Sequence, residues 1–458
     1  MNVIVRENII IQNPTAEVRG WAKQALVLNN PDYYKKVRLG KWTGNTPKTI
    51  ALYEAYPNEI HVPFGCFAKL WKDFRHEAAF SCEIKPTEAR EYTSNINLYP
   101  YQESAAEAIL RAKNGILVMP CGSGKTQTGL EVIARIGGRA LWLTHTQDLL
   151  TQSLNRAKSV LDIGDGTFGK ITEGKVDIGT HITFATVQTM CRIDLSRYRD
   201  CFDVVIVDEC AHAAGSPTRV TQFYKVISSL SARYKIGLTA TPKRSDGLEK
   251  SMFALIGDIA YEVTREDVKH TTCQVKVVSV PTNYSPDYNE VLCADGTLDY
   301  AALVDNLIHD KSRFGVVSDY VNGLKRVIVL ANRVEYIQRL CDEYGGKAVC
   351  LSTMGTSKKA KEQRKQVLRQ LDSGEIDAVF ATYQLAKEGL DVPSLRYVVF
   401  ATPEKDETTV IQSAGRVGRK AEGKDYGTVI DFVDDFGMYY SWKKLRNRYY
   451  KKIDAVVN

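Results

Sequence analysis

Continuous apolar runs of four or five residues recur along the chain between about residue 96 and residue 240. These runs are Gly115–Met119, Ala140–Leu143, Ile182–Ala185, Val204–Val207 and Tyr234–Leu238. A strand that is apolar at every position is buried on both faces, as in a parallel sheet covered by helices. Segments whose apolar spacing suits helices separate most of the runs. The pattern predicts a doubly wound α/β lobe.

A second set of runs begins after Asp310 and predicts a second lobe of the same kind. Its expected strands are Arg326–Ala331, Lys347–Leu351, Asp377–Ala381, Arg396–Phe400 and Tyr426–Asp431. The segment Ser357–Leu371 is expected to form one of the connecting helices. Between the two sets, Pro281–Pro286 is rich in turn-forming residues and marks a crossing between lobes.

The first 95 residues have a different pattern, with short apolar runs separated by turn signals. Val3–Val5, Ile9–Ile11 and Ile60–Val62 are the expected strands of a small mixed α/β or β-rich accessory domain. We therefore predict four parts. They are an accessory domain at 1–95, a first lobe at 96–268, a second lobe at 269–440 and a basic, aromatic C-terminal tail at 441–458.

The composition is that of a globular protein, with 44% hydrophobic and 25% charged residues among 458. No run of about 18 apolar residues predicts a membrane span, and the N-terminal residues lack the pattern of a signal peptide. A cytoplasmic location without a membrane partner is expected. The ten cysteines form no Cys-x-x-Cys pair, so we expect reduced thiols and no zinc site.

The net charge of +7 is unevenly placed. Between Arg19 and Lys48, seven basic residues and one acid alternate with four Trp or Tyr residues, and Tyr439–Lys452 holds six basic residues, no acid and five aromatics. Basic residues mixed with aromatics are typical of nucleic-acid surfaces, where they contact phosphates and stack on bases. The plainer alternative is a solvated charged surface whose aromatics face the core.

The stretch Met119–Thr126 follows an apolar strand and precedes a helical segment, which is the setting of a phosphate loop. In such a loop the backbone around Gly122, Ser123 and Gly124 would bind phosphate oxygens, and Lys125 would place its charge between the β- and γ-phosphates of ATP. The hydroxyl of Thr126 would then bind Mg²⁺. The alternative is a glycine-rich turn that binds nothing.

Two adjacent acids end the strand Val204–Val207. Asp208 suits Mg²⁺ binding, directly or through water, and Glu209 suits activation of the attacking water. The alternative is that both acids cap the helix that follows.

With these residues in place, the chain resembles superfamily 2 helicases of the DEAH-like kind from about residue 96 to residue 435. The resemblance implies two tandem RecA-like lobes. In Leu98–Gln102 it implies that Gln102 reads adenine, and in Gly237–Pro242 it assigns Thr239 and Thr241 to the coupling of hydrolysis with nucleic-acid movement.

The closing motif Ile411–Arg419 resembles that of the second helicase lobe almost residue for residue. The family's pattern implies that Gln412 orients water and that Arg416 and Arg419 reach the γ-phosphate. Hydrolysis is then expected to need the two lobes closed together. An ordinary surface loop is the alternative for both arginines.

The resemblance also implies nucleic-acid contacts and further nucleotide contacts. The nucleic-acid contacts would come from residues that follow strands of the two lobes, namely Thr144, His145, Thr186, Gln188, Asn332, Arg333 and Thr382. For each of these, helix capping is the plainer role. In Lys387–Pro393, Gly389 and Asp391 are expected to face the nucleotide.

Departures from related motifs narrow the expectation. Met119 replaces the first loop glycine, and neither Thr144–Leu149 nor Asp208–His212 matches the motifs of DEAD-box RNA helicases. Gly237–Leu248 resembles the XPB and UvsW group of DNA helicases. The resulting hypothesis is a phage-type branch-migration helicase that acts on forked or junction DNA as a monomer or transient assembly, in the host cytoplasm if phage-encoded.

Three alternatives stay open at this stage. An RNA helicase shares nearly every motif, and a duplex DNA translocase of a restriction-type system would move along DNA without separating its strands. An ATP-dependent binding switch would keep the phosphate loop but lose the catalytic residues, which this chain retains.

Overall fold

The computed structural model describes residues 1–120, 122–164, 166–172, 174–213, 216–242, 247–269, 272–293, 296–355, 357–387 and 392–457. The chain divides into two compact units. The first comprises Met1–Pro120 and Gly124–Thr264, and the second comprises Cys121–Ser123 and Arg265–Asn458. Each unit is described by itself.

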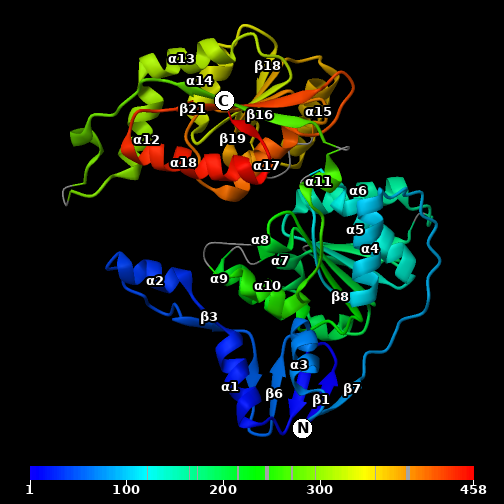
Figure 1. The fold of residues 1–458 in the computed structure, drawn as a ribbon. Helices are drawn as coiled ribbons and strands as arrows, with labels where there is room; N and C mark the ends of the chain where they lie inside the picture. The colour runs from blue at the N-terminus through cyan, green and yellow to red at the C-terminus, as the bar shows by residue number, and fades with distance from the viewer. Residues whose placement is uncertain are drawn as a thin grey trace. The chain divides into compact units, whose positions relative to one another are not determined.

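The first unit begins with a five-stranded sheet, drawn in blue in Figure 1. Its strand order is β5 (Glu54–Ala55), β6 (Glu59–Val62), β2 (Ile9–Gln12), β1 (Asn2–Val5) and β7 (Ala79–Cys82). Alternate residues of β1, β2 and β6 are buried, because one face of the sheet packs against helices α1 (Ala16–Ala25) and α3 (Phe67–Phe74). The apolar runs predicted as strands are present here.

Residues 27–51 form an arm that leaves this sheet, and Figure 1 shows its helix α2 projecting beyond α1. The antiparallel strands β3 (Val27–Asn29) and β4 (Thr49–Ala51) form its base. The helix α2 (Pro31–Arg38) begins where the Asn30 side chain accepts a hydrogen bond from the Asp32 backbone N–H, with Pro31 in the first helical turn. No residue of α2 is buried.

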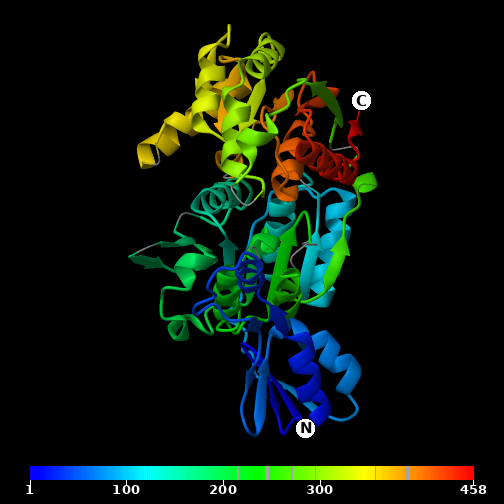
Figure 2. The ribbon, with the colours of Figure 1, turned by 90° about the vertical axis from the view of Figure 1, so that its left-hand side faces the viewer.

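The N-terminal sheet is docked on the first lobe through an apolar interface, and Figure 2 shows the two stacked within the first unit. Val220 and Leu248 of the lobe belong to the same buried cluster as Val3, Ile11 and Leu70. Gly65 lies so close to the lobe that a Cβ there would meet the backbone N of Gly257 at 2.5 Å. The sheet and the lobe therefore share one core.

The first lobe contains an eight-stranded sheet. Its order is β11 (Lys175–Asp177), β10 (Phe168–Thr172), β12 (Ile182–Thr186), β9 (Ala140–Thr144), β13 (Val204–Asp208), β14 (Tyr234–Thr239), β8 (Asn114–Val118) and β15 (Ile259–Glu262). All neighbours pair in parallel except β10 and β11. The helices α4 (Pro100–Ala112), α5 (Lys125–Ile136), α6 (Gln147–Val160) and α10 (Glu249–Ile256) accompany this sheet. The five predicted strands are its central members.

The second unit contains a seven-stranded sheet in which every pair is parallel. Its order is β18 (Ala348–Cys350), β19 (Ala378–Thr382), β17 (Val327–Ala331), β20 (Tyr397–Phe400), β21 (Tyr426–Val433), β16 (Gln274–Pro281) and β22 (Val456–Val457). The predicted helix appears as α15 (Lys358–Ser373), with Ser357 as its N-cap. The strand β16 was not predicted, because its burial alternates along the strand and no continuous apolar run marks it.

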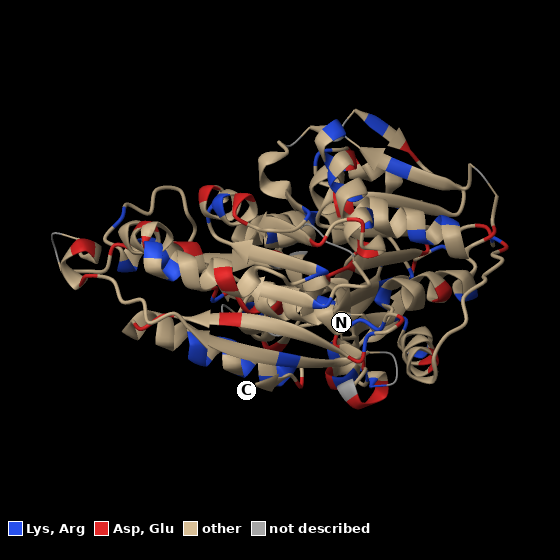
Figure 3. Ribbon diagram, turned by 90° about the horizontal axis from the view of Figure 1, so that it is seen from above, with Lys and Arg blue, Asp and Glu red and all other residues tan. Residues whose placement is uncertain are grey.

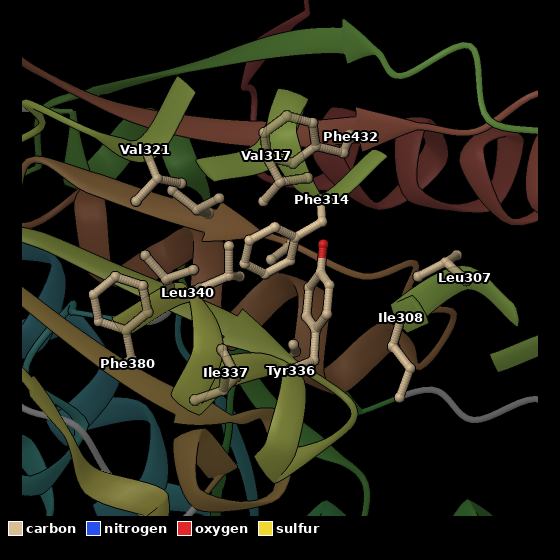
Figure 4. Close-up of a cluster of buried hydrophobic side chains, with 14 of the residues drawn as sticks. Leu307, Ile308, Phe314, Val317, Val321, Tyr336, Ile337, Leu340, Phe380 and Phe432 are labelled. Carbon is tan, nitrogen blue, oxygen red and sulfur yellow. The ribbon is translucent and has the colours of Figure 1, made fainter. Parts of the chain in front are cut away.

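One face of this sheet is covered by α13 (Lys311–Val321) and α14 (Val334–Asp342). Figure 4 shows Phe314, Val317 and Val321 meeting Tyr336 and Phe432 in this core, all of them buried. The adjoining fully buried Arg313 donates to Asp434 Oδ1 at 2.7 Å and to the Tyr336 hydroxyl at 2.8 Å. A buried charge of this kind needs such partners, which fix α13 against the end of β21.

The stretch predicted as a C-terminal tail is packed on the second lobe instead. It lies mostly in the helix α18 (Gly437–Lys452), where Tyr439, Arg446 and Tyr450 are buried. Arg446 pairs with Asp431 of β21 at 2.8 Å, and the Tyr450 hydroxyl donates to the same carboxylate at 3.0 Å. Tyr439 and Tyr450 thus face the core, as the plainer alternative for this stretch expects, whereas Tyr440 is exposed.

Positive and negative residues are intermixed along most elements, as the blue and red bands of Figure 3 show. Among the described residues, no helix has both the length and the apolar character that a bilayer crossing requires.

Candidate functional site

The phosphate loop lies between β8 and α5, as predicted. Gly122 and Gly124 both have φ of 82°, a left-handed backbone that glycine adopts without strain. Lys125 starts the helix α5, and its Nζ lies 3.3 Å from Glu209 Oε1 and 3.5 Å from the Met119 carbonyl oxygen. Cys121 lies outside the described residues. The loop thus has the backbone and the charge that a phosphate group requires.

Gln102 is held beside this loop at the start of α4. Its Oε1 accepts a hydrogen bond from the Tyr99 backbone N–H at 2.9 Å, and the side chain is buried. A Cβ at Gly124 would lie 2.3 Å from Gln102 Nε2. Gly124 leaves room for the amide of Gln102, so this side chain can pack directly against the phosphate loop.

The two predicted acids stand at the carboxyl end of β13, in the middle of the sheet. Asp208 is buried, and Ser153 Oγ of α6 donates to its Oδ2 at 3.4 Å. Burial and the neighbouring Glu209 carboxylate raise the pKa of Asp208 to about 7. Ser153 was not predicted, because nothing in a helical sequence shows which hydroxyl faces the sheet.

Glu209 has a left-handed backbone with φ of 50°, which is costly for a residue with a side chain. Burial would raise the pKa of its carboxyl, but the Lys125 ammonium and the imidazole of His212 hold that pKa below its usual value. Glu209 is therefore held as a carboxylate beside the phosphate loop, in the protonation state that a general base needs.

The residues assigned to Mg²⁺ fit that ion. Asp208 has a buried carboxyl whose hydrogen bond from Ser153 is long, so a bound cation would restore its ionised form. Thr126 follows Lys125 in the first turn of α5. One carboxylate and one hydroxyl, completed by phosphate oxygens and water, are a usual protein ligand set for Mg²⁺.

The coupling motif begins in the last residues of β14, which lies between β13 and β8 in the sheet. The Thr239 carbonyl accepts a hydrogen bond from the Met119 backbone N–H at 2.8 Å, and Thr239 Oγ1 accepts one from the Thr241 N–H at 3.3 Å. A Cβ at Gly237 would meet Cys210 Sγ at 2.8 Å, so this glycine lets the helix after the acids pack directly on β14. The motif is thus bonded directly to the first residue of the phosphate loop.

His145 and His212 form a stacked pair that the sequence did not predict. Their ring centroids lie 4.4 Å apart with an interplanar angle of 18°. Burial and the neighbouring His212 lower the pKa of His145 to about 3. His145 therefore stacks as a neutral ring on His212, three residues after Glu209, and its role in nucleic-acid binding stays a prediction.

The other first-lobe residues predicted to contact nucleic acid have internal roles for their hydroxyls. Thr144 Oγ1 donates to the Thr146 carbonyl oxygen at 2.9 Å and is buried. Thr186 caps the helix α7 (Val187–Met190), accepting from the Thr189 N–H at 3.2 Å. Gln188 lies in the same helix with its Oε1 buried and without a hydrogen-bond partner. The hydroxyls of both threonines are thus already hydrogen-bonded within the lobe, one in a turn and one in a helix cap.

In the second unit, Asn332 and Arg333 follow β17, and Thr382 ends β19. The Asn332 Nδ2 donates to the Pro403 carbonyl oxygen at 3.2 Å, while the exposed Arg333 lies 3.8 Å from Asp305. The Thr382 backbone N–H donates to Ser352 Oγ at 2.8 Å. These three positions share one edge of the sheet, because β17 and β19 are parallel neighbours.

The closing motif forms the helix α17 (Glu407–Val417) and the residues after it. Gln412 and Arg416 are four residues apart and so share one helix face. The Arg416 Nη2 donates to the Ala386 carbonyl oxygen at 2.7 Å, and Arg419 bridges to Thr272 in an antiparallel pair. The predicted nucleotide contacts Gly389 and Asp391 lie outside the described residues.

Two domain models match the chain in tandem. One, described as the res subunit of type III restriction enzymes, matches residues 95–244, and the other, described as the helicase conserved C-terminal domain, matches residues 312–421. These ranges hold the phosphate loop, the paired acids and the arginine motif. Each lobe thus carries its own helicase match.

Two curated relatives cover most of the chain. A candidate ATP-dependent RNA helicase of Acanthamoeba polyphaga mimivirus is 24% identical over 381 residues, which cover 80% of this chain and 70% of that protein. The DNA 3'-5' translocase XPB2 of Sulfurisphaera tokodaii is 25% identical over 361 residues, covering 71% of this chain and 80% of that protein.

Among solved structures, the ATP-dependent Type ISP restriction-modification enzyme LlaBIII bound to DNA aligns with a TM-score of 0.58 and 18% identity. The alignment covers 80% of this chain and 32% of LlaBIII. This likeness confirms the predicted fold of two tandem RecA-like lobes. Together, the two domain matches and the relatives show an enzyme that hydrolyses ATP, and they support its place among the superfamily 2 helicases.

Proposed function

We propose that this helicase acts on DNA and that it unwinds or branch-migrates forks and junctions. The observation that carries the proposal is the motif content of the first lobe. Asp208–His212 departs from the DEAD-box motif of RNA helicases, and Gly237–Leu248 resembles the XPB and UvsW group. The match to a DNA 3'-5' translocase covers 71% of the chain. The accessory domain fits the same proposal, because its basic arm is exposed beside the first lobe.

The first lobe would bind ATP and prepare the attacking water. Lys125 and the backbone of Gly122–Gly124 would hold the phosphates, and Gln102, packed against Gly124, would bind the adenine. Thr126 and Asp208 would hold Mg²⁺, which neutralises charge on the phosphates when bound. The carboxylate of Glu209 would accept the proton from the attacking water.

The second lobe would supply the remaining groups of the reaction. By resemblance, Gln412 would orient the water, and Arg416 and Arg419 would stabilise charge on the γ-phosphate, with Gly389 and Asp391 also facing the nucleotide. An arginine supplied by a second domain contributes on the order of 10³-fold or more in rate. Since Lys125 and Arg416 belong to different units, turnover would depend on closure of the lobes.

The DNA backbone would follow the strand ends that Asn332, Arg333 and Thr382 occupy. In the first lobe we propose that backbone N–H groups near Thr144 and Thr186 grip the phosphates, because both hydroxyls are already bonded internally. Thr239 and Thr241 would couple hydrolysis to strand movement through the bond between Thr239 and Met119. We propose action as a monomer or a transient assembly.

An RNA helicase is the second candidate, and the mimivirus relative favours it. Measurement of ATP turnover with single-stranded DNA or RNA of the same sequence and length separates the two. The proposal predicts stronger stimulation by DNA, and equal or stronger stimulation by RNA would contradict it. A duplex translocase would instead respond to blunt duplex DNA and displace no strand.

A further inference from the structure

The arm of residues 27–51 has no core of its own, and its surface is unusual for a helix of a globular protein. Every residue of α2 is at least partly exposed, including Tyr34 and Val37. Leu39 is likewise exposed, and the indole of Trp42 is 88% exposed with its ring against Gly44. Exposed aromatic and apolar side chains gathered on one segment mark an interaction surface.

The same segment carries concentrated positive charge. Lys35, Lys36, Arg38 and Lys41 lie within seven residues of chain, while Asp32 is the single acid between Arg19 and Lys48. Lys36 Nζ donates to Thr46 Oγ1 at 2.7 Å. Among the residues that the structure describes, Lys35, Arg38 and Lys41 form no ion pair. The charge is therefore available to a partner.

A cleft of about 550 Å³ lies between this arm and the first lobe. Lys35, Lys36 and Lys41 line the arm side together with the acid Asp32, and Pro217, Thr218 and Thr221 line the other side. The second group belongs to the first turns of α9 (Pro217–Ile227). The arm side thus has three lysines against one acid, a net positive charge that suits an anionic chain. On the lobe side the Thr221 hydroxyl already donates to the Pro217 carbonyl oxygen at 3.0 Å, so Thr218 offers the hydroxyl there.

We propose that this cleft binds the phosphodiester backbone of an unpaired DNA strand, with Trp42 stacking on one of its bases. The inference rests on the proposed DNA helicase function and assigns the arm to the unpaired strand at a branch. Lysines that surround a backbone, next to an aromatic ring that accepts any base, are the arrangement of sequence-independent single-strand sites. An exposed indole has no comparable partner in a duplex, where the bases are already stacked.

The lobe side of the cleft is connected to the catalytic segment. Arg219 Nη1, in the first turns of α9, donates to the His212 carbonyl oxygen at 3.4 Å. His212 stacks on His145 and lies three residues after Glu209. A strand held against α9 would therefore contact an element that is hydrogen-bonded to the helix after the catalytic acids, so fork binding should affect ATP turnover.

The test measures the affinity for a DNA fork with unpaired arms by fluorescence anisotropy. The titrations are made without nucleotide at a series of salt concentrations. Each lysine that contacts a single-strand phosphate contributes about 0.7 to the slope of log affinity against log salt, so Lys35→Ala/Lys41→Ala should lower the slope by roughly 1.4. Trp42→Ala should weaken binding roughly 5- to 150-fold, the range for one stacked base. Trp42→Phe should restore most of the loss, because it keeps a ring.

The matched control is Lys72→Ala/Arg75→Ala, which removes two exposed basic residues from the same accessory domain, on and after α3. In this control, the salt slope should decrease by less than half as much as it does in the arm variant. Equal slopes for the two double variants, or fork affinity unchanged by Trp42→Ala, would overturn the proposal. Equal melting temperatures exclude misfolding, which is not expected because no residue of α2 is buried.

ATP-driven unwinding of a tailed duplex by the unmodified protein separates this inference from the proposed function. If the unmodified protein unwinds DNA while the arm variants bind forks normally, the cleft assignment alone fails. If it displaces no strand at all, the proposed function fails, and the binding data still decide whether the cleft holds a strand.

Discussion

Glu209 is the residue whose conformation reveals most about the catalytic site. Its left-handed backbone, at φ of 50°, is a strained state that costs of the order of 1–3 kcal/mol and persists only when its surroundings enforce it. The conformation brings its carboxylate within 3.3 Å of Lys125 Nζ. The strain therefore places the proposed base beside the residue that binds the phosphates.

Glu209→Gln should lower DNA-stimulated ATP turnover by roughly 10²- to 10⁴-fold, the usual contribution of a general base. Nucleotide binding should persist, because the phosphate loop and Lys125 are unchanged. Steady-state turnover and binding of a fluorescent nucleotide measure the two effects. Glu107→Gln, on the exposed side of α4, is the control, and near-normal turnover of the Glu209 variant would remove that residue from the mechanism.

Arg416→Ala should lower turnover on the order of 10³-fold while ATP still binds, because an arginine finger acts on charge in the transition state. Single-turnover hydrolysis and nucleotide binding are compared in the same preparation. Arg369→Ala, on the exposed face of α15, removes an arginine from the same unit as a control. Loss of binding together with turnover would instead indicate that the Arg416 bond to Ala386 is structural.

At the residue scale, the sequence predicted which side chains lie together in the site better than it predicted which way a side chain points. Motif spacing placed Lys125 and Glu209 correctly beside one another, because a phosphate loop and an acid at a strand end meet at one sheet edge. It did not show that the hydroxyls of Thr144 and Thr186 face inward. A small polar residue after a strand can cap the next helix or face solvent, and the same sequence pattern is compatible with both orientations.

At the scale of elements, β14 links the coupling motif with the accessory domain. Lys235 of this strand is fully buried, and its Nζ donates to the carbonyl oxygens of Glu7 at 2.7 Å and Ile227 at 2.9 Å. The ammonium also lies 4.7 Å from the centre of the Phe64 ring. One lysine thus fastens the turn after β1 to the strand that ends at Thr239.

Burial lowers the pKa of Lys235 to about 7, while the carboxylate of Glu7 opposes that shift. In the unfolded chain its pKa is about 10.4, so between the two values the unfolded state binds more protons and stability rises with pH. Stability therefore falls as the pH is lowered from about 10 to about 7, and it levels off below about 7, where both states bind the proton. The expected slope is about 1.4 kcal/mol per pH unit.

Lys235→Met should remove this slope. Urea unfolding at several pH values between about 7 and 10, on the unmodified protein and the variant, measures the difference. Arg199, which pairs with Glu7 at 2.7 Å, remains in both and cancels in the comparison. Parallel pH profiles would show that Lys235 does not titrate in this range.

Element prediction succeeded where strands are buried on both faces and failed at the edges. The central strands β9, β12 and β13 are buried at every position, so their apolar runs are continuous. The missed strands β11 and β15 are mostly exposed, and β16 alternates. Likewise, the basic, aromatic helix α18 could not be distinguished from a surface tail, because its partner Asp431 lies on β21.

At the scale of the whole molecule, the accessory domain is a structural component of the first unit, and its proposed DNA binding has to be tested without disturbing that role. Removal of residues 1–95 would expose Val220 and Leu248, which share its core. It would also remove Thr87, whose backbone N–H donates to Asp203 Oδ1 at 2.7 Å just before β13. Such a deletion should destabilise the first lobe, and a loss of DNA binding in it would not identify the binding surface.

A better variant replaces residues 30–48 with an Asn-Gly turn that joins β3 directly to β4. These strands pair antiparallel, with Asn29 opposite Thr49, so a two-residue hairpin turn can close them. This armless protein should keep its melting temperature and its basal ATP turnover while fork stimulation of turnover falls several-fold. Unchanged fork stimulation would show that the arm does not contribute to activity on branched DNA.

The most direct test of the account is ATP-driven strand displacement on a three-strand fork, a four-way junction and a tailed duplex, each prepared in DNA and in RNA. We expect the DNA fork and junction to be resolved fastest, the tailed DNA duplex more slowly, and the RNA substrates least. All activity should require ATP and disappear in Lys125→Ala. Faster displacement of RNA, or no preference for branched DNA, would contradict the proposed role as a DNA branch-remodelling helicase.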